Sequence, residues 1–141
     1  MAREGSEAVR ALADALRDVP RELRPQVRKA LKSGGEGIRA RAAQEASWSR
    51  RIPRSLRVRT RFGGTRAGVY VTASRLAAPQ ARPFEGITGN AEFRHPVPGT
   101  GRWVSQKVRP FLAPAVGQQA DRAMNEVKQA LDDALRGVGL I

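Results

Sequence analysis

The acidic residues and the one histidine in the middle of the chain are the groups from which a catalytic site would be built. His95 is the only histidine, and Glu85 and Glu92 are the only acidic residues between positions 46 and 120. A glycine-containing segment separates the two glutamates, with neither helical nor strand spacing to pair them. Acid/base carboxylates must be held within about 5–10 Å of each other. We therefore predict no catalytic residues and a non-enzymatic protein.

Metal and cofactor sites are not expected either. The chain has no cysteine and one histidine, which excludes thiolate sites and sites built from several histidines. Gly63-Gly64-Thr65 and Gly99-Thr100-Gly101 are too short for a phosphate-binding loop and lack the helix and lysine that follow one. No apolar run approaches the ~20 residues of a membrane span. We predict no metal, no cofactor and no membrane partner.

Arginine dominates the middle of the chain. The net charge is +13, and residues 46–120 hold 13 basic and 2 acidic side chains. A stretch without any acidic residue contains Arg50, Arg51, Arg54, Arg57, Arg59, Arg61 and Arg66. The planar guanidinium binds carboxylates and phosphates through two parallel hydrogen bonds. The chemistry that this arginine stripe, residues 50–66, offers is therefore recognition of anions.

Three interpretations of the arginine stripe stay open at this point. It can be a solvated sheet face that discourages edge-to-edge aggregation, an interface with an acidic protein, or a contact with nucleic-acid phosphates. No helix-turn-helix or zinc-finger signature accompanies the charge, which disfavours sequence-specific DNA readout. One tyrosine and few phenylalanines do not make the stacking platform of a single-strand binder. A basic nucleic-acid-binding module that uses Arg50–Arg66 is the alternative function.

The N-terminal third of the chain has helical periodicity. Apolar residues at i, i+3, i+4 and i+7 predict two helices within residues 1–47, separated at Pro20. Gly34, Gly35 and Gly37 lie inside the second helix, and each costs about 0.5–1 kcal/mol relative to alanine. They indicate a bend or break in that helix, or else a place where another backbone approaches closely.

The period then changes from 3.6 to 2. Alternating apolar and arginine residues over 56–62, a glycine turn and a returning strand over 67–73 predict a β-hairpin. The alternation places Arg57, Arg59 and Arg61 on the same face. Residues 74–101 are rich in proline and glycine and predict a long loop. Short strands near residues 92–95 and 103–107 would interrupt it.

A final helix is predicted over residues 114–136, with Gly137 and Gly139 ending it. Pro110 and Pro114 bracket Phe111 and Leu112 just before this helix. This element is either a staple that packs under the helix or a direct subunit contact. Trp48 and Trp103 are expected in the core, with a place at an interface as the alternative for each.

These elements predict one α+β domain over residues 1–141. It consists of N-terminal helices (1–47), a small, mostly antiparallel β-sheet with a long Pro/Gly-rich loop (55–108) and a C-terminal helix (114–136).

Four short runs between residues 79 and 115 carry a family resemblance: PQARPFE (79–85), FRHPV (93–97), WVSQ (103–106) and VRPFLAPA (108–115). They resemble the siphophage neck and tail-completion family, a group of minor tail components and head–tail joining proteins. The actinobacteriophage-like branch is the most similar. The most specific element is Arg-Pro-Phe-Leu-x-Pro-Ala, which opens the C-terminal helix. The resemblance extends over most of the chain.

The resemblance implies a structural virion protein at the head–tail junction, assembled in the cytoplasm of a bacterial host. Such a subunit forms a ring, commonly a hexamer, that helps join the tail to the head and lets DNA pass. Its partners would be copies of itself, adjacent head-closure or connector proteins, and tail-tube or terminator proteins, with possible non-specific contact with passing DNA. The candidate interface residues are Arg57, Arg59, Arg61, Arg82, Phe84, Phe93, Trp103, Arg109 and Phe111.

Overall fold

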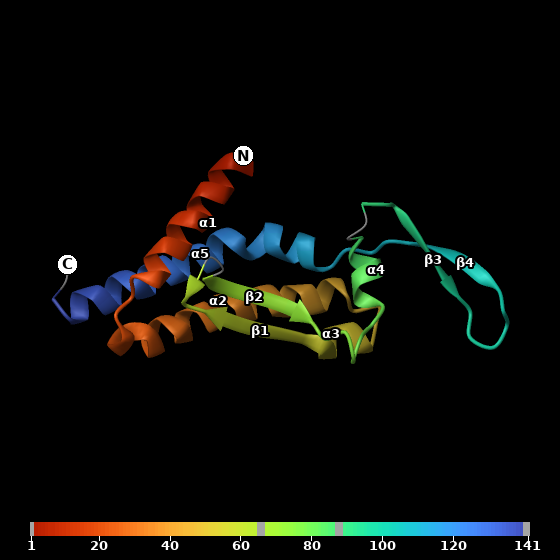
Figure 1. The fold of residues 1–141 in the computed structure, drawn as a ribbon, viewed down its shortest axis with the longest axis horizontal. Helices are drawn as coiled ribbons and strands as arrows, with labels where there is room; N and C mark the ends of the chain where they lie inside the picture. The colour runs from red at the N-terminus through yellow and green to blue at the C-terminus, as the bar shows by residue number, and fades with distance from the viewer. Residues whose placement is uncertain (1, 65–66, 87–88, 140–141) are drawn as a thin grey trace.

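The computed structural model describes residues 2–64, 67–86 and 89–139 (Figure 1). The elements in chain order are α1 (Ala2–Arg17), a 3₁₀ turn (Arg21–Leu23), α2 (Arg24–Glu45), α3 (Arg51–Ser55), β1 (Leu56–Arg61), β2 (Gly68–Ala73), α4 (Ala81–Glu85), β3 (Glu92–Pro96), β4 (Trp103–Lys107) and α5 (Leu112–Gly137). Helices at both ends of the chain and antiparallel strands between them confirm the predicted α+β class.

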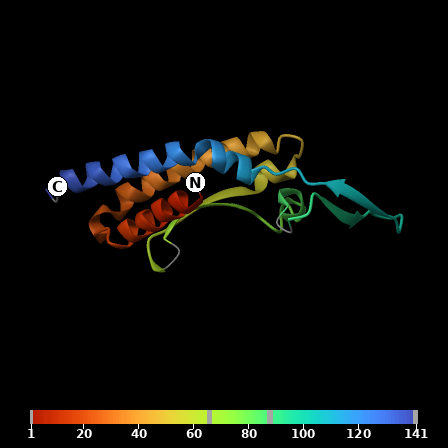
Figure 2. The same cartoon turned by 90° about the horizontal axis from the view of Figure 1, so that it is seen from above.

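We call the part of the molecule formed by α1, α2, α5 and the β1–β2 hairpin the body, and helix α2 is its central layer. It packs against α5 on one side and against both strands of the β1–β2 hairpin on another, and the two long helices run in opposite directions (Figures 1 and 2). Helix α1 lies against the same end of the body as the C-terminal part of α5. Two sides of α2 are therefore covered, one by α5 and the other by the first hairpin.

Two of the glycines in α2 lie where this packing is close. A Cβ atom at Gly34 would lie 3.2 Å from the Cβ of Ala123 in α5. A Cβ atom at Gly35 would lie 2.5 Å from Cγ1 of Val58 and 2.7 Å from Cγ2 of Val69, on β1 and β2. Helix α2 continues unbroken through them, so the predicted break into two helices is wrong. The alternative, a close approach of another segment, is confirmed within the same chain.

The first hairpin has the predicted alternation. Strands β1 and β2 pair antiparallel from Leu56 opposite Ala73 to Arg61 opposite Gly68. Along β1, the three arginines are exposed, while Val58 and Thr60 are half-buried. The prediction that Arg57, Arg59 and Arg61 share one face is confirmed, and that face is exposed.

The predicted single sheet is two separate sheets, because β3 and β4 pair only with each other in the described part of the chain. Their register runs from Glu92 opposite Lys107 to Pro96 opposite Trp103. The Pro/Gly-rich stretch is also more structured than predicted. The short helix α4 lies inside it, because Ala81 and Phe84 are apolar residues that pack into the core.

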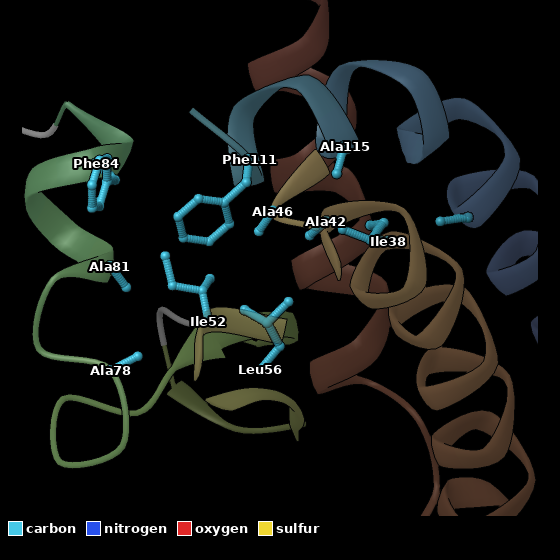
Figure 3. Packing of buried hydrophobic residues seen from close by; sticks show 11 residues of the cluster. Ile38, Ala42, Ala46, Ile52, Leu56, Ala78, Ala81, Phe84, Phe111 and Ala115 are labelled. Atoms are coloured by element: carbon cyan, nitrogen blue, oxygen red, sulfur yellow. The ribbon is translucent and has the colours of Figure 1, made fainter. Parts of the chain in front are cut away.

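Two clusters of buried side chains form the core. The first lies around α4 and the start of α5 (Figure 3) and contains Ile38, Ala42, Ala46, Ile52, Leu56, Ala78, Ala81, Phe84, Phe111, Ala115 and Ala123. The second joins α1 to α2, α5 and the turn end of the first hairpin and contains Leu16, Val19, Leu23, Val27, Leu31, Phe62, Ala67, Val127 and Ala134. Small residues in both clusters allow the layers to approach closely.

We expect the two neighbouring glycines Gly35 and Gly37 to respond in opposite ways to alanine. Gly35→Ala forces a methyl group against Val58 and Val69, and overpacking of this kind costs about 1–3 kcal/mol. Gly37→Ala meets only Gln119 Oε1 at 3.9 Å, so it gains the helix propensity of alanine, about 0.5–1 kcal/mol. Urea unfolding of the two variants measures both changes, and equal stabilisation by both would contradict the close approach.

Candidate functional site

The carboxylate of Glu85 at the end of α4 holds the N-terminus of α5. Its Oε2 accepts hydrogen bonds from the backbone N–H groups of Phe111 (2.8 Å) and Leu112 (2.9 Å), and its Oε1 accepts one from Ala113 (2.8 Å). The first N–H groups of a helix have no partner within the helix. The first residues of α5 provide no side-chain cap themselves. A negative charge from a distant segment therefore caps this helix and complements its dipole.

The segment just before α5 is tied to α4 by the backbone as well. The N–H of Arg109 donates to the carbonyl of Phe84 at 2.8 Å, and the N–H of Val108 donates to the carbonyl of Ala91 at 3.0 Å. Because β3 and β4 lie between these two tied segments, the entry to and exit from the second hairpin are held side by side.

Aromatic contacts connect this junction to the body. The ring centroids of Trp48 and Phe84 are 4.5 Å apart, and those of Phe84 and Phe93 are 5.0 Å apart in an edge-to-face arrangement. The guanidinium of Arg109 lies 4.5 Å from the Trp48 centroid, within the range of a cation–π interaction. The base of the second hairpin is therefore packed as well as hydrogen-bonded.

Beyond this base, the second hairpin projects away from the body (Figures 1 and 2). We call residues 92–107 the hairpin arm. One of its faces is formed by Glu92, Arg94, Pro96, Trp103, Ser105 and Lys107, all of them exposed. The other face is formed by Phe93, His95, Val104 and Gln106. Trp103 is 60% exposed and Val104 40% exposed, so each face carries an exposed apolar side chain.

A second candidate surface is the outer face of the β1–β2 hairpin. We call it the arginine face; it consists of Arg57, Arg59, Arg61, Tyr70 and Thr72. Tyr70 lies opposite Arg59, and Thr72 lies opposite Arg57. Arg59, Arg61, Tyr70 and Thr72 line a shallow depression on this face. The Arg57 guanidinium donates to the carbonyls of Arg54 and Leu56, which holds it along the strand.

The groups considered for catalysis occupy three different places. The Glu85 carboxylate is occupied by three backbone N–H groups. Glu92 accepts a hydrogen bond from the Ser105 hydroxyl on the exposed face of the arm. His95 is on the opposite face of β3, where Nε2 lies 2.8 Å from Gln106 Oε1. The structure does not bring these three side chains together. Among the described residues, no three histidine, aspartate or glutamate side chains group as metal ligands would.

The predicted interface residues separate into exposed and buried groups. Arg57, Arg59, Arg61, Arg82, Trp103 and Arg109 are exposed, and Phe93 is half-buried at the base of the arm. The core position expected for Trp103 is wrong, because no element among the described residues packs over its face of the arm. Trp48 packs against the first core cluster, as predicted. Arg66 of the arginine stripe lies outside the described residues.

Two predicted interface residues are in the core instead. Phe111 is fully buried and Phe84 is 8% exposed, and both belong to the first core cluster (Figure 3). Helix α5 begins at Leu112, two residues before the predicted start, and Phe111 turns inward where the helix begins. The proline-bracketed element therefore packs under the helix, and its phenylalanine ring has no surface to offer a neighbour.

The role of Glu85 was not predicted, although a signal for it exists in the sequence. No serine, threonine, aspartate or asparagine lies between positions 106 and 120 to cap a helix that begins there. The free N–H groups must therefore find an acceptor elsewhere, and Glu85 and Glu92 are the only acidic residues in the middle of the chain.

Comparison with known proteins identifies no relative: no family model, no curated protein and no solved structure matches the chain. Among the described residues, no helix is long and apolar enough to cross a membrane.

We expect Glu85→Gln to lower the free energy of unfolding by about 2 kcal/mol. The amide removes the negative charge and one acceptor oxygen, and a hydrogen bond to a charged group is worth about 1.5–3 kcal/mol. Glu92→Gln is the matched control. Glu92 is exposed and has one hydrogen bond to Ser105, so its change stays within about 0.5 kcal/mol. Denaturant unfolding measures both, and similar losses for both variants would contradict the capping role.

Proposed function

We propose that this chain is a structural subunit of the head–tail junction of a tailed bacteriophage, where copies of it form a ring. The observation that carries the proposal is the hairpin arm. A two-stranded hairpin on its own is at best marginally stable in water. This one extends beyond the body with apolar side chains exposed on both of its faces, which is the arrangement expected of a segment that is completed by a neighbour.

The composition of the arm supports a protein partner. Tryptophan and arginine are the residue types most enriched at the energetic centres of protein interfaces. Trp103 lies on the same exposed face as Arg94, with Pro96 directly opposite it. An exposed tryptophan beside a proline supplies apolar area, and the neighbouring arginine supplies hydrogen-bond donors. Both strand edges of the arm also carry backbone groups that can pair with another chain.

The firm attachment of the arm supports its role in binding a neighbour, because a firmly held arm loses less entropy on binding than a loose one. The Glu85 cap, the backbone bonds of Val108 and Arg109 and the aromatic contacts of Phe84 hold its base. The runs of sequence that resemble the siphophage neck and tail-completion family, residues 79–115, form this same base and arm. Closed rings are built from head-to-tail contacts between unlike surfaces, and an arm that reaches a neighbour's body is one such contact.

We expect Trp103→Ala to prevent incorporation of the protein into virions while leaving its fold intact. Trp103 is outside both core clusters, and loss of a hot-spot tryptophan costs about 2 kcal/mol or more, which is about 30-fold or more in affinity. The variant is supplied to a phage that lacks the gene, and its copies per particle are counted by quantitative mass spectrometry. Leu76→Ala is the control, because Leu76 is 99% exposed outside the arm.

In the same experiment, the wild-type copy number is expected to be a multiple of six, as in a six-fold ring. A count that is not a multiple of three would overturn the ring. Incorporation of Trp103→Ala at the wild-type level, with an unchanged melting temperature, would overturn the role of the arm.

A further inference from the structure

No described element of the chain covers the arginine face. The inner face of the β1–β2 hairpin packs on α2, where Val58 and Val69 contact the backbone at Gly35. The outer face therefore points away from the body. Successive arginines on it are two residues apart, which spaces their Cα atoms about 6.6–6.8 Å along the strand. The result is a row of three guanidinium groups on an open surface.

The charge of this row is not balanced by nearby carboxylates. Residues 46–84 contain nine arginines and no acidic residue. Among the described residues, the four ion pairs all lie within helices α1, α2 and α5. None of these ion pairs neutralises an arginine of the arginine face. Its positive charge is therefore available to an anionic partner.

Further arginines continue the charge at both ends of β1. Arg51 and Arg54 of α3 precede the strand and are exposed. At the other end, the guanidinium groups of Arg24 and Arg28 from α2 lie 5.7 and 5.2 Å from the ring centroid of Phe62, which belongs to the second core cluster. Arg51 and Arg54 thus extend the exposed charge beyond the start of the strand, while Arg24 and Arg28 add cationic groups on the α2 side of the hairpin.

The composition of the arginine face distinguishes between two kinds of anionic partner, an acidic protein and a nucleic acid. Arginine does occur at the centre of protein–protein interfaces, but beside aromatic and other apolar side chains, and that centre is depleted in charged residues as a whole. The centre of this face is arginine, with tyrosine, threonine and glycine on the paired strand. Interfaces with nucleic acid are more polar and much more positively charged. A single aromatic side chain, Tyr70, does not make the stacking platform that single-strand binders use.

We propose that the arginine face binds the phosphate backbone of duplex DNA without reading its sequence. Arg59 and Arg61 contact phosphates, and Arg57, held by the carbonyls of Arg54 and Leu56, extends the row. This binding surface is separate from the hairpin arm, so it does not depend on the proposed ring.

The test is a fluorescence-anisotropy titration of the full chain with a labelled duplex of about 21 base pairs, two helical turns, at several salt concentrations between about 50 and 200 mM. The test variant is Arg59→Gln/Arg61→Gln. The control is Lys128→Gln/Arg136→Gln, which removes the same net charge from exposed positions on α5. Melting temperatures confirm that all three proteins are folded.

We expect wild-type affinity to fall steeply with salt, because each phosphate neutralised by a basic side chain releases counterions. Arg59→Gln/Arg61→Gln should bind at least about 10-fold more weakly and lower the salt slope by about 2, one for each lost phosphate contact. The control should keep the wild-type slope. Equal loss in both variants would mean attraction by net charge alone and would overturn the proposal.

Two further measurements on the unmodified chain complete the test. Arginine-selective chemical labelling, read by mass spectrometry, should show DNA protecting Arg59 and Arg61 but not Arg122 or Arg136. Poly-glutamate is the competitor that represents an acidic protein. Displacement of the duplex by poly-glutamate at equal charge concentration, or absence of protection on β1, would overturn the assignment of DNA as the partner.

Discussion

One long-range interaction determines how the hairpin arm is joined to the body: the carboxylate of Glu85 on three backbone N–H groups at the start of α5. It joins residues 26 positions apart in the sequence, with the whole hairpin arm between them. Because the helix has no cap of its own, the bond satisfies donors that would otherwise be left without a partner. The same bond brings the two ends of the arm together, and the aromatic contacts of Phe84 then form around it.

A second constraint, the close packing of α2, determines which side chains of the first hairpin are exposed. Gly34 and Gly35 allow α5 on one side and the two strands on another to approach without a side chain between them. Since one face of a two-stranded sheet is taken up by this contact, the side chains of the other face must point outward. The arginines of β1 are displayed for this reason, and the positions between them carry the residues that pack inward.

The arm and the arginine face differ in chemistry as well as in location. The arm combines exposed apolar side chains with a few charged ones, on strands whose edges are open. The arginine face is almost entirely cationic and polar. A subunit that binds protein neighbours with one surface and a polyanion with another gains from such a separation, because neither partner then competes for the other's site. The proposed place at a head–tail junction, where protein rings surround DNA, would use both surfaces.

The sequence alone predicted the α+β class, the first hairpin and the exposed arginines, because each of these follows from a local period of apolar residues. The second pair of strands was also located, since prolines and glycines bracket it. The inward position of Phe111, the exposure of Trp103 and the cap supplied by Glu85 were decided by the tertiary structure. Each depends on which distant segment lies beside the residue: α4 lies beside the start of α5, and no described segment covers Trp103. Local periodicity reports which face of an element is apolar, but the partner of that face is set only when the whole chain packs.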